Sequence, residues 1–312
     1  MNILLKPVII QIHKENSGGG IADLLKGMFT LYNECKKMNI KYYLDLSSNP
    51  KLKQCFNLPN IPEYYKDFEC ETLNLMDQIY DYNKFNELII EKIKKPKIYY
   101  IITNCCGFGN YIEYINNINE INNIIKPSLI INEKINNLYN IYNFKENNYI
   151  SIHFRTGDHN MIKQFNDNIN NSNTDIRIEL DNNIFEKIIN KIDIMNKEYN
   201  KDNLPLIIHS DSNILKNNLK KLNDNLILLD INIQHICNNI GNNNEDSFIS
   251  TISEFFIISK ASKVFMMDVY SGFSHLASVI GNKELIVNID DKHMYPKNIL
   301  DLLKPEKVIK TN

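Results

Sequence analysis

Long apolar segments are absent from this 312-residue sequence. No run approaches the roughly 20 residues that a helix needs to cross a bilayer. The apolar start, residues 1–10, is interrupted by Lys6 and Pro7 and carries no cationic leader or cleavage site, so we expect a core strand there and not a signal peptide. These absences predict a soluble protein that works in a cytoplasm.

Paired cysteine motifs are absent as well. The six cysteines are spread along the chain with no CxxC pair and no repeated spacing. We therefore expect thiols of a reducing compartment, and neither a disulfide framework nor a zinc site. No other credible cluster of metal ligands is found, so no metal is expected. The cysteines are Cys35, Cys55, Cys70, Cys105, Cys106 and Cys237.

An excess of basic charge is also lacking. The formal net charge is -2 at pH 7, which gives no support for nucleic-acid binding along a basic surface. An anionic partner would have to be held by a few placed cations. The phosphate-binding sequence GxxxxGK[ST] is missing from the second half, which disfavours a P-loop kinase or ATPase.

Apolar residues are nevertheless plentiful, at 43% of the chain. That is enough to fill the cores of two α/β domains of roughly 150 residues each. Asn and Ile are used to excess, a pattern typical of an AT-rich genome such as that of a bacterium, a protist or a large DNA virus of one. Because Asn is a poor helix former, this usage blurs the helix boundaries.

The start of the chain reads as a βαβ unit. Residues 7–12 and 40–46 have the pattern of strands, and apolar residues at helical spacing predict a helix over about 21–38. The loop before this helix ends in Gly18, Gly19 and Gly20. Backbone N–H groups in such a loop suit an anion at the helix N-terminus, and a merely flexible turn is an equal alternative.

The rest of the first half is less informative. From residue 52 to 97 only two helical stretches are predicted, near 76–83 and 85–94. A strand is expected at 98–104, and two further helices are expected within 111–142. Residues 143–148 look like a link, so we expect an N-terminal domain over 1–145 and a C-terminal domain over 146–312.

The second half repeats the α/β pattern. Strands are predicted at 149–153, 205–209, 226–230 and 264–268, and helices at 183–199, up to 222, at 250–260 and after residue 274. Three of the strands run into polar turns, which contain His153, Arg155 and Asp158; Ser210, Asp211 and Ser212; and Ser271, Gly272, Phe273 and Ser274. Ligands of open α/β sheets bind at the carboxyl ends of the strands, although any single turn of this kind is more often simply solvated.

Together the three turns offer a guanidinium, an imidazole, several hydroxyls and a helix N-terminus. This set suits a diphosphate, because a guanidinium grips phosphate oxygens in bidentate fashion and stays charged at any working pH. The charge on a departing nucleoside diphosphate would then be compensated by Arg155 and backbone dipoles, and not by a metal ion.

The sequence from His153 to Asp158, HFRTGD, resembles the HxRxGD motif of the fucosyltransferase superfamily. That superfamily includes α1,2- and α1,6-fucosyltransferases, the rhizobial nodulation enzyme and the protein O-fucosyltransferases. The glycine loop and helix at 18–27, the sequence HSDS at 209–212 and the run 254–274 are similar to further elements of the family, in the same order. The tract from about 50 to 145 contributes nothing to the resemblance.

The resemblance implies a GT-B fold, in which two Rossmann-like domains face each other across a cleft. The N-terminal domain would take the acceptor and the C-terminal domain the sugar nucleotide. It also implies an inverting, metal-independent transfer of fucose from GDP-fucose to a glycan hydroxyl, with no cofactor. The partners would therefore be a sugar nucleotide and a glycan acceptor, with no nucleic acid and no membrane span.

Roles are carried over by position. Arg155 would bind the diphosphate and stabilise leaving GDP, and His153 would support the nucleotide. Glu254 would read the guanine base, unless it is only a carboxylate at a helix N-terminus. Ser271 and Ser274 would contact phosphate, and Asp211 has the alternative of capping the next helix. The expected nucleotide-binding residues are Gly18, Gly19, Gly20, His153, Arg155, Ser210, Asp211, Glu254, Ser271, Gly272, Phe273 and Ser274.

The sequence departs from the family in one place and leaves one role open. Thr156 stands where many members have a second Arg, so the donor can differ from GDP-fucose. Candidates for the general base are Asp158, Asp23 and Glu15, and Asp158 can equally brace Arg155. Two rival interpretations remain: an inverting transferase for another sugar nucleotide, and a non-catalytic nucleotide- or glycan-binding protein.

Overall fold

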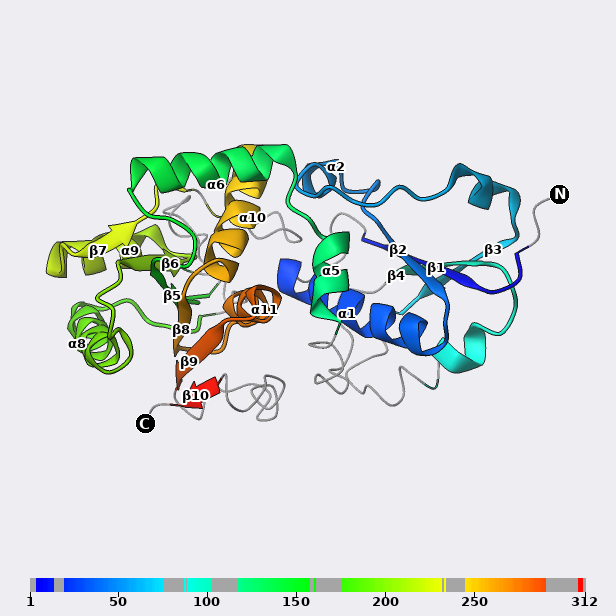
Figure 1. The fold of residues 1–312 in the computed structure, drawn as a ribbon. Coiled ribbons are helices and arrows are strands. Elements are labelled where there is room, and N and C mark those ends of the chain that lie inside the picture. Colours follow the sequence, from blue (N-terminus) through cyan, green and yellow to red (C-terminus); the bar gives the residue numbers. More distant parts are fainter. Residues whose placement is uncertain are drawn as a thin grey trace. The chain divides into compact units, whose positions relative to one another are not determined.

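The chain divides into two units, each a parallel β-sheet with helices packed on it (Figure 1). The computed structural model describes residues 4–13, 20–75, 87, 89–102, 117–157, 160, 176–231, 233, 245–289 and 308–310. The first unit contains the described residues up to Leu129, and the second contains those from Ile130 onward. The units thus divide earlier in the chain than the boundary that we placed after residue 145.

The first unit is built on a four-stranded parallel sheet in the order β2-β1-β4-β3. Its strands are β1 (Val8–Ile12), β2 (Lys41–Asp45), β3 (Cys70–Asn74) and β4 (Ile98–Ile102). Helix α1 (Ile21–Lys37) links β1 to β2, which confirms the predicted βαβ unit. Strand β3 was not predicted. Only Leu73 of β3 is buried, so its sequence has no alternating pattern.

The first unit also contains shorter helical segments. These are α2 (Pro50–Lys53), the 3-10 helix η1 (Glu63–Asp67), helical residues at 87 and 89–92, and α5 (Ile118–Ile124). The side chain of Asn49 caps the start of α2 by accepting from the Leu52 N–H at 3.1 Å. The helical stretch predicted at 76–83 lies outside the described residues.

The second unit has a six-stranded parallel sheet in the order β10-β9-β8-β5-β6-β7. Its strands are β5 (Ile150–Phe154), β6 (Leu206–Ser210), β7 (Leu226–Leu228), β8 (Lys263–Asp268), β9 (Glu284–Ile289) and β10 (Val308–Lys310). The four predicted strands are confirmed, and β9 and β10 are additional. Strand β5 is central and buried at every residue. The carboxyl ends of β6, β5 and β8 therefore lie along one edge of the sheet.

Helices cover both faces of this sheet. They are α8 (Asn182–Tyr199), α9 (Asn213–Leu222), α10 (Glu245–Ser259) and α11 (Gly272–Gly281), and a further helix, α6 (Leu129–Ile141), precedes β5 in the chain. Ile150, Ile152 and Phe154 of β5 pack with α8 and α9 in one core cluster. Because side chains alternate along a strand, Ser151 and His153 point to the opposite face, where α10 and α11 lie (Figure 1).

Helix α10 begins earlier than the helix predicted at 250–260. Its first turn carries Glu245 and Asp246, and carboxylates are favoured there by the helix dipole although they break the apolar pattern. From Ser247 to Ser259 every residue of α10 is buried. Within the described parts of the chain, none of the helices combines the length and the hydropathy that a membrane crossing requires.

The described cysteines form no disulfide. Cys35 and Cys55 are buried, and Cys70 is exposed. Cys105, Cys106 and Cys237 lie outside the described residues. No group of three or more His, Cys, Asp or Glu side chains that could hold a metal ion occurs in the part of the chain that the structure describes.

The end of α11 lies against the end of α10 at Gly281. A Cβ atom built on Gly281 would lie 1.8 Å from the carbonyl oxygen of Ser259, the last residue of α10. That oxygen belongs to the backbone and cannot turn aside as a side chain can. We expect the substitution Gly281→Ala to lower the free energy of unfolding by about 1–3 kcal/mol or more, measured by urea denaturation.

The neighbouring residue provides the control for this prediction. Asn282 has φ of 53°, a left-handed conformation that Gly adopts without strain. Asn282→Gly should therefore leave the stability close to that of the wild type. A Gly281→Ala variant with an unchanged urea midpoint would contradict the close approach of the two helices.

Candidate functional site

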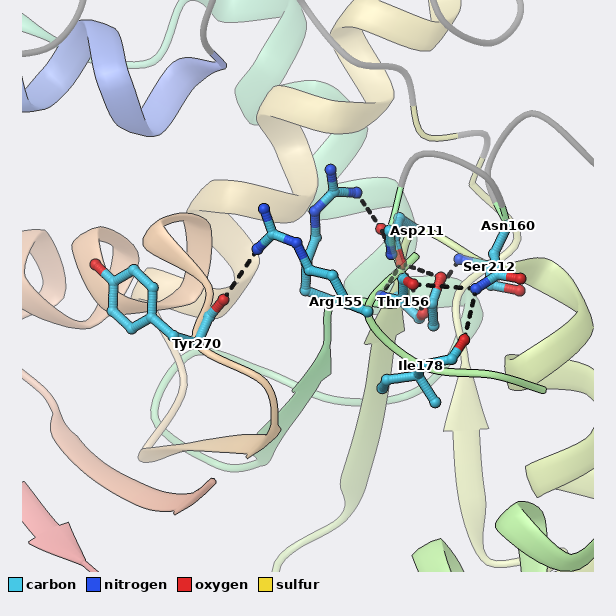
Figure 2. Close-up of polar contacts among 10 residues, drawn as sticks. Arg155, Thr156, Asn160, Ile178, Asp211, Ser212 and Tyr270 are labelled. Atoms are coloured by element: carbon cyan, nitrogen blue, oxygen red, sulfur yellow. Dashed lines mark hydrogen bonds and ion pairs between the residues drawn. The ribbon is translucent and has the colours of Figure 1, made fainter. Parts of the chain in front are cut away.

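The turn that follows β5 is held by one carboxylate from the next strand. Phe154 at the end of β5 lies opposite Ser210 at the end of β6, which brings Asp211 beside residues 155–157. Asp211 is 5% exposed and forms an ion pair with Nη1 of Arg155. It also accepts from the backbone N–H and the hydroxyl of Thr156, both at 2.7 Å, and from the Gly157 N–H at 3.1 Å. Figure 2 shows Arg155 and Thr156 directed at Asp211.

These contacts keep Asp211 ionised. Burial acts to raise the pKa of this carboxyl group, but the Arg155 charge and the bonds from Thr156 and Gly157 outweigh it, so the pKa lies below its ordinary value. The alternative that Asp211 caps α9 is wrong. Ser212 is the N-cap residue instead, and its hydroxyl accepts from the Leu215 N–H at 3.2 Å.

Thr156, which directly follows Arg155, has a structural role in this turn. Thr156 is buried, and its hydroxyl is committed to Asp211. Gly157 follows with φ of 106°, a conformation that favours glycine and that directs its N–H to the same carboxylate. A Thr in place of the family's second Arg therefore provides one of the bonds that hold Asp211.

The turn after β8 lies at the same edge of the sheet. Met267 near the end of β8 is opposite Phe154, and the chain then runs through Tyr270 to Ser271, the residue that precedes α11. Ser271 and Ser274 are buried, and the Ser274 hydroxyl donates to the Ser271 carbonyl at 3.5 Å. The N-terminus of a ten-residue helix, with its partial positive charge, is thus placed next to the Arg155 turn.

His153 is a neutral imidazole that belongs to the α11 side of the sheet. It stacks on Phe273, with ring centroids 5.7 Å apart and an angle of 27° between the planes, and Phe273 in turn contacts Phe255 edge-on. Burial, with the nearby His209 as a smaller cause, lowers the pKa of His153 to about 3. Its buried Nδ1 atom has no hydrogen-bond partner among the described residues.

Glu254 lies inside the unit and takes part in a buried chain of polar groups. Its Oε1 atom is 3.1 Å from Nδ1 of His209, and Nε2 of His209 is 3.1 Å from the Ser151 hydroxyl. Glu254 is 2% exposed and belongs to the second half of α10, so the alternative of a helix N-terminal carboxylate is wrong. The base-reading role assigned to Glu254 stays a prediction.

Lys216 of α9 is a further buried charge in this region. Burial lowers the pKa of its amine, against the attraction of Glu254, Asp230 and Asp211. The region behind the Arg155 turn thus contains buried groups of both signs. Such groups are tolerated in a protein interior only where they compensate one another.

The glycine loop of the first unit is described only at its last residue. The Gly20 N–H donates to the Asp23 carboxylate at 3.0 Å, and Asp23 also pairs with Lys26 at 3.0 Å. Asp23 therefore serves as a capping residue at the start of α1, which accounts for one of the three candidate bases. The other two, Glu15 and Asp158, lie outside the described residues, as do Gly18 and Gly19.

One residue at this edge was missed by the sequence analysis. Arg177 donates from its backbone N–H to the Thr156 carbonyl at 3.0 Å, and from Nη1 to the Tyr270 carbonyl at 3.3 Å. It follows a long polar stretch without periodicity, which gave no reason to select it. The scarcity of arginine in the sequence was the signal that would have pointed to it.

Two parallel α/β units with polar turns at the strand ends define the chain as a protein of the GT-B fold class, as expected. No protein-family profile and no curated protein sequence matches it. Solved structures, however, are similar to it. NodZ α-1,6-fucosyltransferase co-crystallised with GDP aligns with a TM-score of 0.55 at 10% identity, over 87% of this chain and 91% of that one.

Two further structures show the same similarity. A mutant of Arabidopsis thaliana FUT1 in complex with GDP aligns with a TM-score of 0.55 at 10% identity, over 93% of this chain and 72% of that one. NodZ soaked with GDP-fucose gives 0.54 at 11% identity, over 88% and 92%. This chain therefore has the fold of these fucosyltransferases, and the resemblance seen in its sequence is confirmed at the level of the fold.

The Asp211 bonds predict a defined dependence of stability on pH. Asp211→Asn should lower the free energy of unfolding at pH 7 by about 2–5 kcal/mol, because Arg155 and two backbone N–H groups lose an ionised acceptor. The folded-state pKa of Asp211 lies below the value near 3.9 of an unfolded chain. Its stabilisation is therefore complete above about pH 5 and is lost as the pH falls through the folded-state pKa.

The measurement is urea denaturation of the wild type and Asp211→Asn from pH 8 to pH 3. The difference between the two should be constant down to about pH 5 and should shrink below it, while other acid-sensitive groups cancel in the difference. Asp202→Asn, at an exposed position, should give no difference at any pH. A difference for Asp211→Asn that does not change in acid would contradict the ionised carboxylate.

Proposed function

We propose that this chain is a glycosyltransferase that moves fucose from GDP-fucose to a hydroxyl of a glycan, with inversion and without a metal ion. The observation that carries the proposal is the Arg155 guanidinium, which Asp211 holds at the carboxyl end of β5. It lies at the same edge as the N-terminus of α11, in a fold shared with NodZ, whose structures were co-crystallised with GDP and soaked with GDP-fucose.

The Arg155 side chain suits a diphosphate because its orientation is already set. A guanidinium has five N–H donors in a planar fork, so it can serve a carboxylate and a phosphate at the same time. The Asp211 contact removes the cost of ordering a flexible side chain when the ligand binds. The N–H groups at the start of α11 add positive charge that does not depend on pH.

The proposed reaction is a single displacement at the anomeric carbon of fucose. An acceptor oxygen forms a bond to that carbon as the bond to the β-phosphate oxygen breaks, through an oxocarbenium-like transition state. The electron pair of the broken bond stays on GDP, where Arg155 stabilises the added negative charge. The acceptor proton passes to a general base.

Asp158 is our candidate for that base. Its alternative role was to brace Arg155, and Asp211 already fills this role. Asp23 is engaged in capping α1. Asp158 follows Gly157 directly and so belongs to the turn that carries Arg155.

The nucleotide preference can be tested by thermal unfolding. We expect GDP and GDP-fucose to raise the melting temperature, with UDP, CMP and their sugars having no effect. Stabilisation follows from binding to the native state and amounts to about 2.7 kcal/mol at a ligand concentration 100 times Kd. Selective stabilisation by another nucleotide would point to a different donor, and no response to any nucleotide would overturn the proposal.

The role of Arg155 can be tested in a transfer or donor-hydrolysis assay. Arg155→Lys keeps the charge but loses the planar fork, and we expect kcat to fall about 10²–10³-fold with an unchanged melting temperature. The rate of the wild type should be the same in EDTA. Activity of Arg155→Lys near that of the wild type would refute the role, and loss of activity in EDTA would refute metal independence.

A variant of an exposed basic residue outside the proposed site serves as the control for this assay. Lys201→Met removes an exposed cation from the turn after α8, which leads into the amino end of β6. It should retain full activity. GDP binding without any turnover of GDP-fucose would instead favour a non-catalytic nucleotide-binding protein.

A further inference from the structure

Arginine is nearly absent from this chain. Of its 35 basic Lys and Arg residues only two are arginines, Arg155 and Arg177. Both lie at the carboxyl edge of the second sheet, and the sequence separation between them gave no sign of this. We propose that Arg177 is a second guanidinium that binds the donor's diphosphate, an inference that rests on the proposed function.

The backbone of Arg177 is fixed against the Arg155 turn. The N–H groups of Arg177 and Ile178 both donate to the Thr156 carbonyl, at 3.0 and 3.2 Å. Asn160 strengthens this link, because its side-chain amide donates to the Thr156 carbonyl at 3.0 Å and to the Ile178 carbonyl at 2.9 Å (Figure 2). Arg177 is therefore attached to the residue that directly follows Arg155.

The side chain of Arg177 reaches toward the start of α11. Its Nη1 atom donates to the carbonyl of Tyr270, which is followed by Ser271 and the first turn of the helix. Figure 2 includes this bond at the labelled Tyr270. The guanidinium thus lies between the Thr156 turn and the helix N-terminus, the two features that the proposed function assigns to the diphosphate.

This position brings a guanidinium close to a helix N-terminus, and both features attract anions. A helix N-terminus carries partial positive charge and is stabilised by anions, not by cations. A guanidinium placed there raises the local positive potential. A phosphate between the two would interact favourably with both, as anions bound at helix N-termini do.

The charge of the ligand also calls for a second cation. Arg155 already forms an ion pair with the buried Asp211, so part of its charge is compensated before any ligand binds. A diphosphate carries more than one negative charge, and the departing group gains another in the proposed reaction. A second guanidinium would supply compensation that Mg²⁺ supplies in metal-dependent transferases.

The choice of arginine at these two positions is chemically specific. The chain uses lysine at every other basic position. Lysine is a compact point charge, whereas arginine presents a rigid fork that matches the oxygens of a phosphate. A chain so rich in lysine that has arginine only here indicates sites where lysine does not suffice.

The test compares the wild type with Arg177→Lys and Arg177→Gln. We expect both variants to bind GDP about 10- to 100-fold more weakly in calorimetry, the loss of a charge-assisted pair. Guanosine, which has no phosphate, should bind all three proteins equally in an NMR titration. Melting temperatures without ligand should not fall, because the backbone bonds of residue 177 remain. Lys201→Gln serves as the control and should bind GDP normally.

The outcomes distinguish a failure of this inference from a failure of the proposed function. Unchanged GDP affinity in both variants would overturn the role of Arg177 and leave the proposed function intact. Equal losses for guanosine and GDP, or lower melting temperatures without ligand, would show a structural role and also overturn it. A wild type that binds no nucleoside diphosphate would overturn the proposed function and this inference with it.

Discussion

The bond network around Asp211 is the constraint on which the rest of the proposed site depends. A buried carboxylate is tolerated only when its charge and its lone pairs are satisfied. Here the donors come from three successive residues, Arg155 to Gly157, so the whole turn is ordered around one acceptor. The register of β5 against β6 sets the position of that acceptor. The pairing of β5 with β6, the conformation of the turn and the orientation of the Arg155 guanidinium therefore depend on one another.

The alternation of side chains along β5 divides the unit into two chemically different halves. Ile150, Ile152 and Phe154 face α8 and α9 and form an apolar core. Ser151 and His153 face α10 and α11, where polar groups such as Glu254 are buried in pairs. The apolar half supplies stability, and the polar half carries the groups at the strand ends. A slip of one residue in β5 would exchange the two faces and destroy both.

The elements that position the site were predictable from the sequence because their signals are strong. β5, β6 and β8 are apolar runs that stop at polar turns, and α11 follows small and hydroxyl residues. β3 was missed because a largely exposed edge strand has no pattern. Contacts between distant residues were not predictable. Asp211 and Ser212 are both residue types that cap helices, so either could have been the N-cap of α9. Only the fold shows that Ser212 is the cap and that Asp211 contacts the turn after β5.

The charges at the carboxyl edge do not change across the physiological pH range. Arg155 and Arg177 stay protonated at any working pH, Asp211 is ionised well into the acid range, and His153 is neutral above about pH 3. Donor binding at this edge should then vary little with pH near neutrality. A pH dependence of the proposed transfer in that range would have to arise from a different group. The general base is the group whose protonation must change during the reaction, so the pH profile of kcat would report on it and not on the diphosphate site.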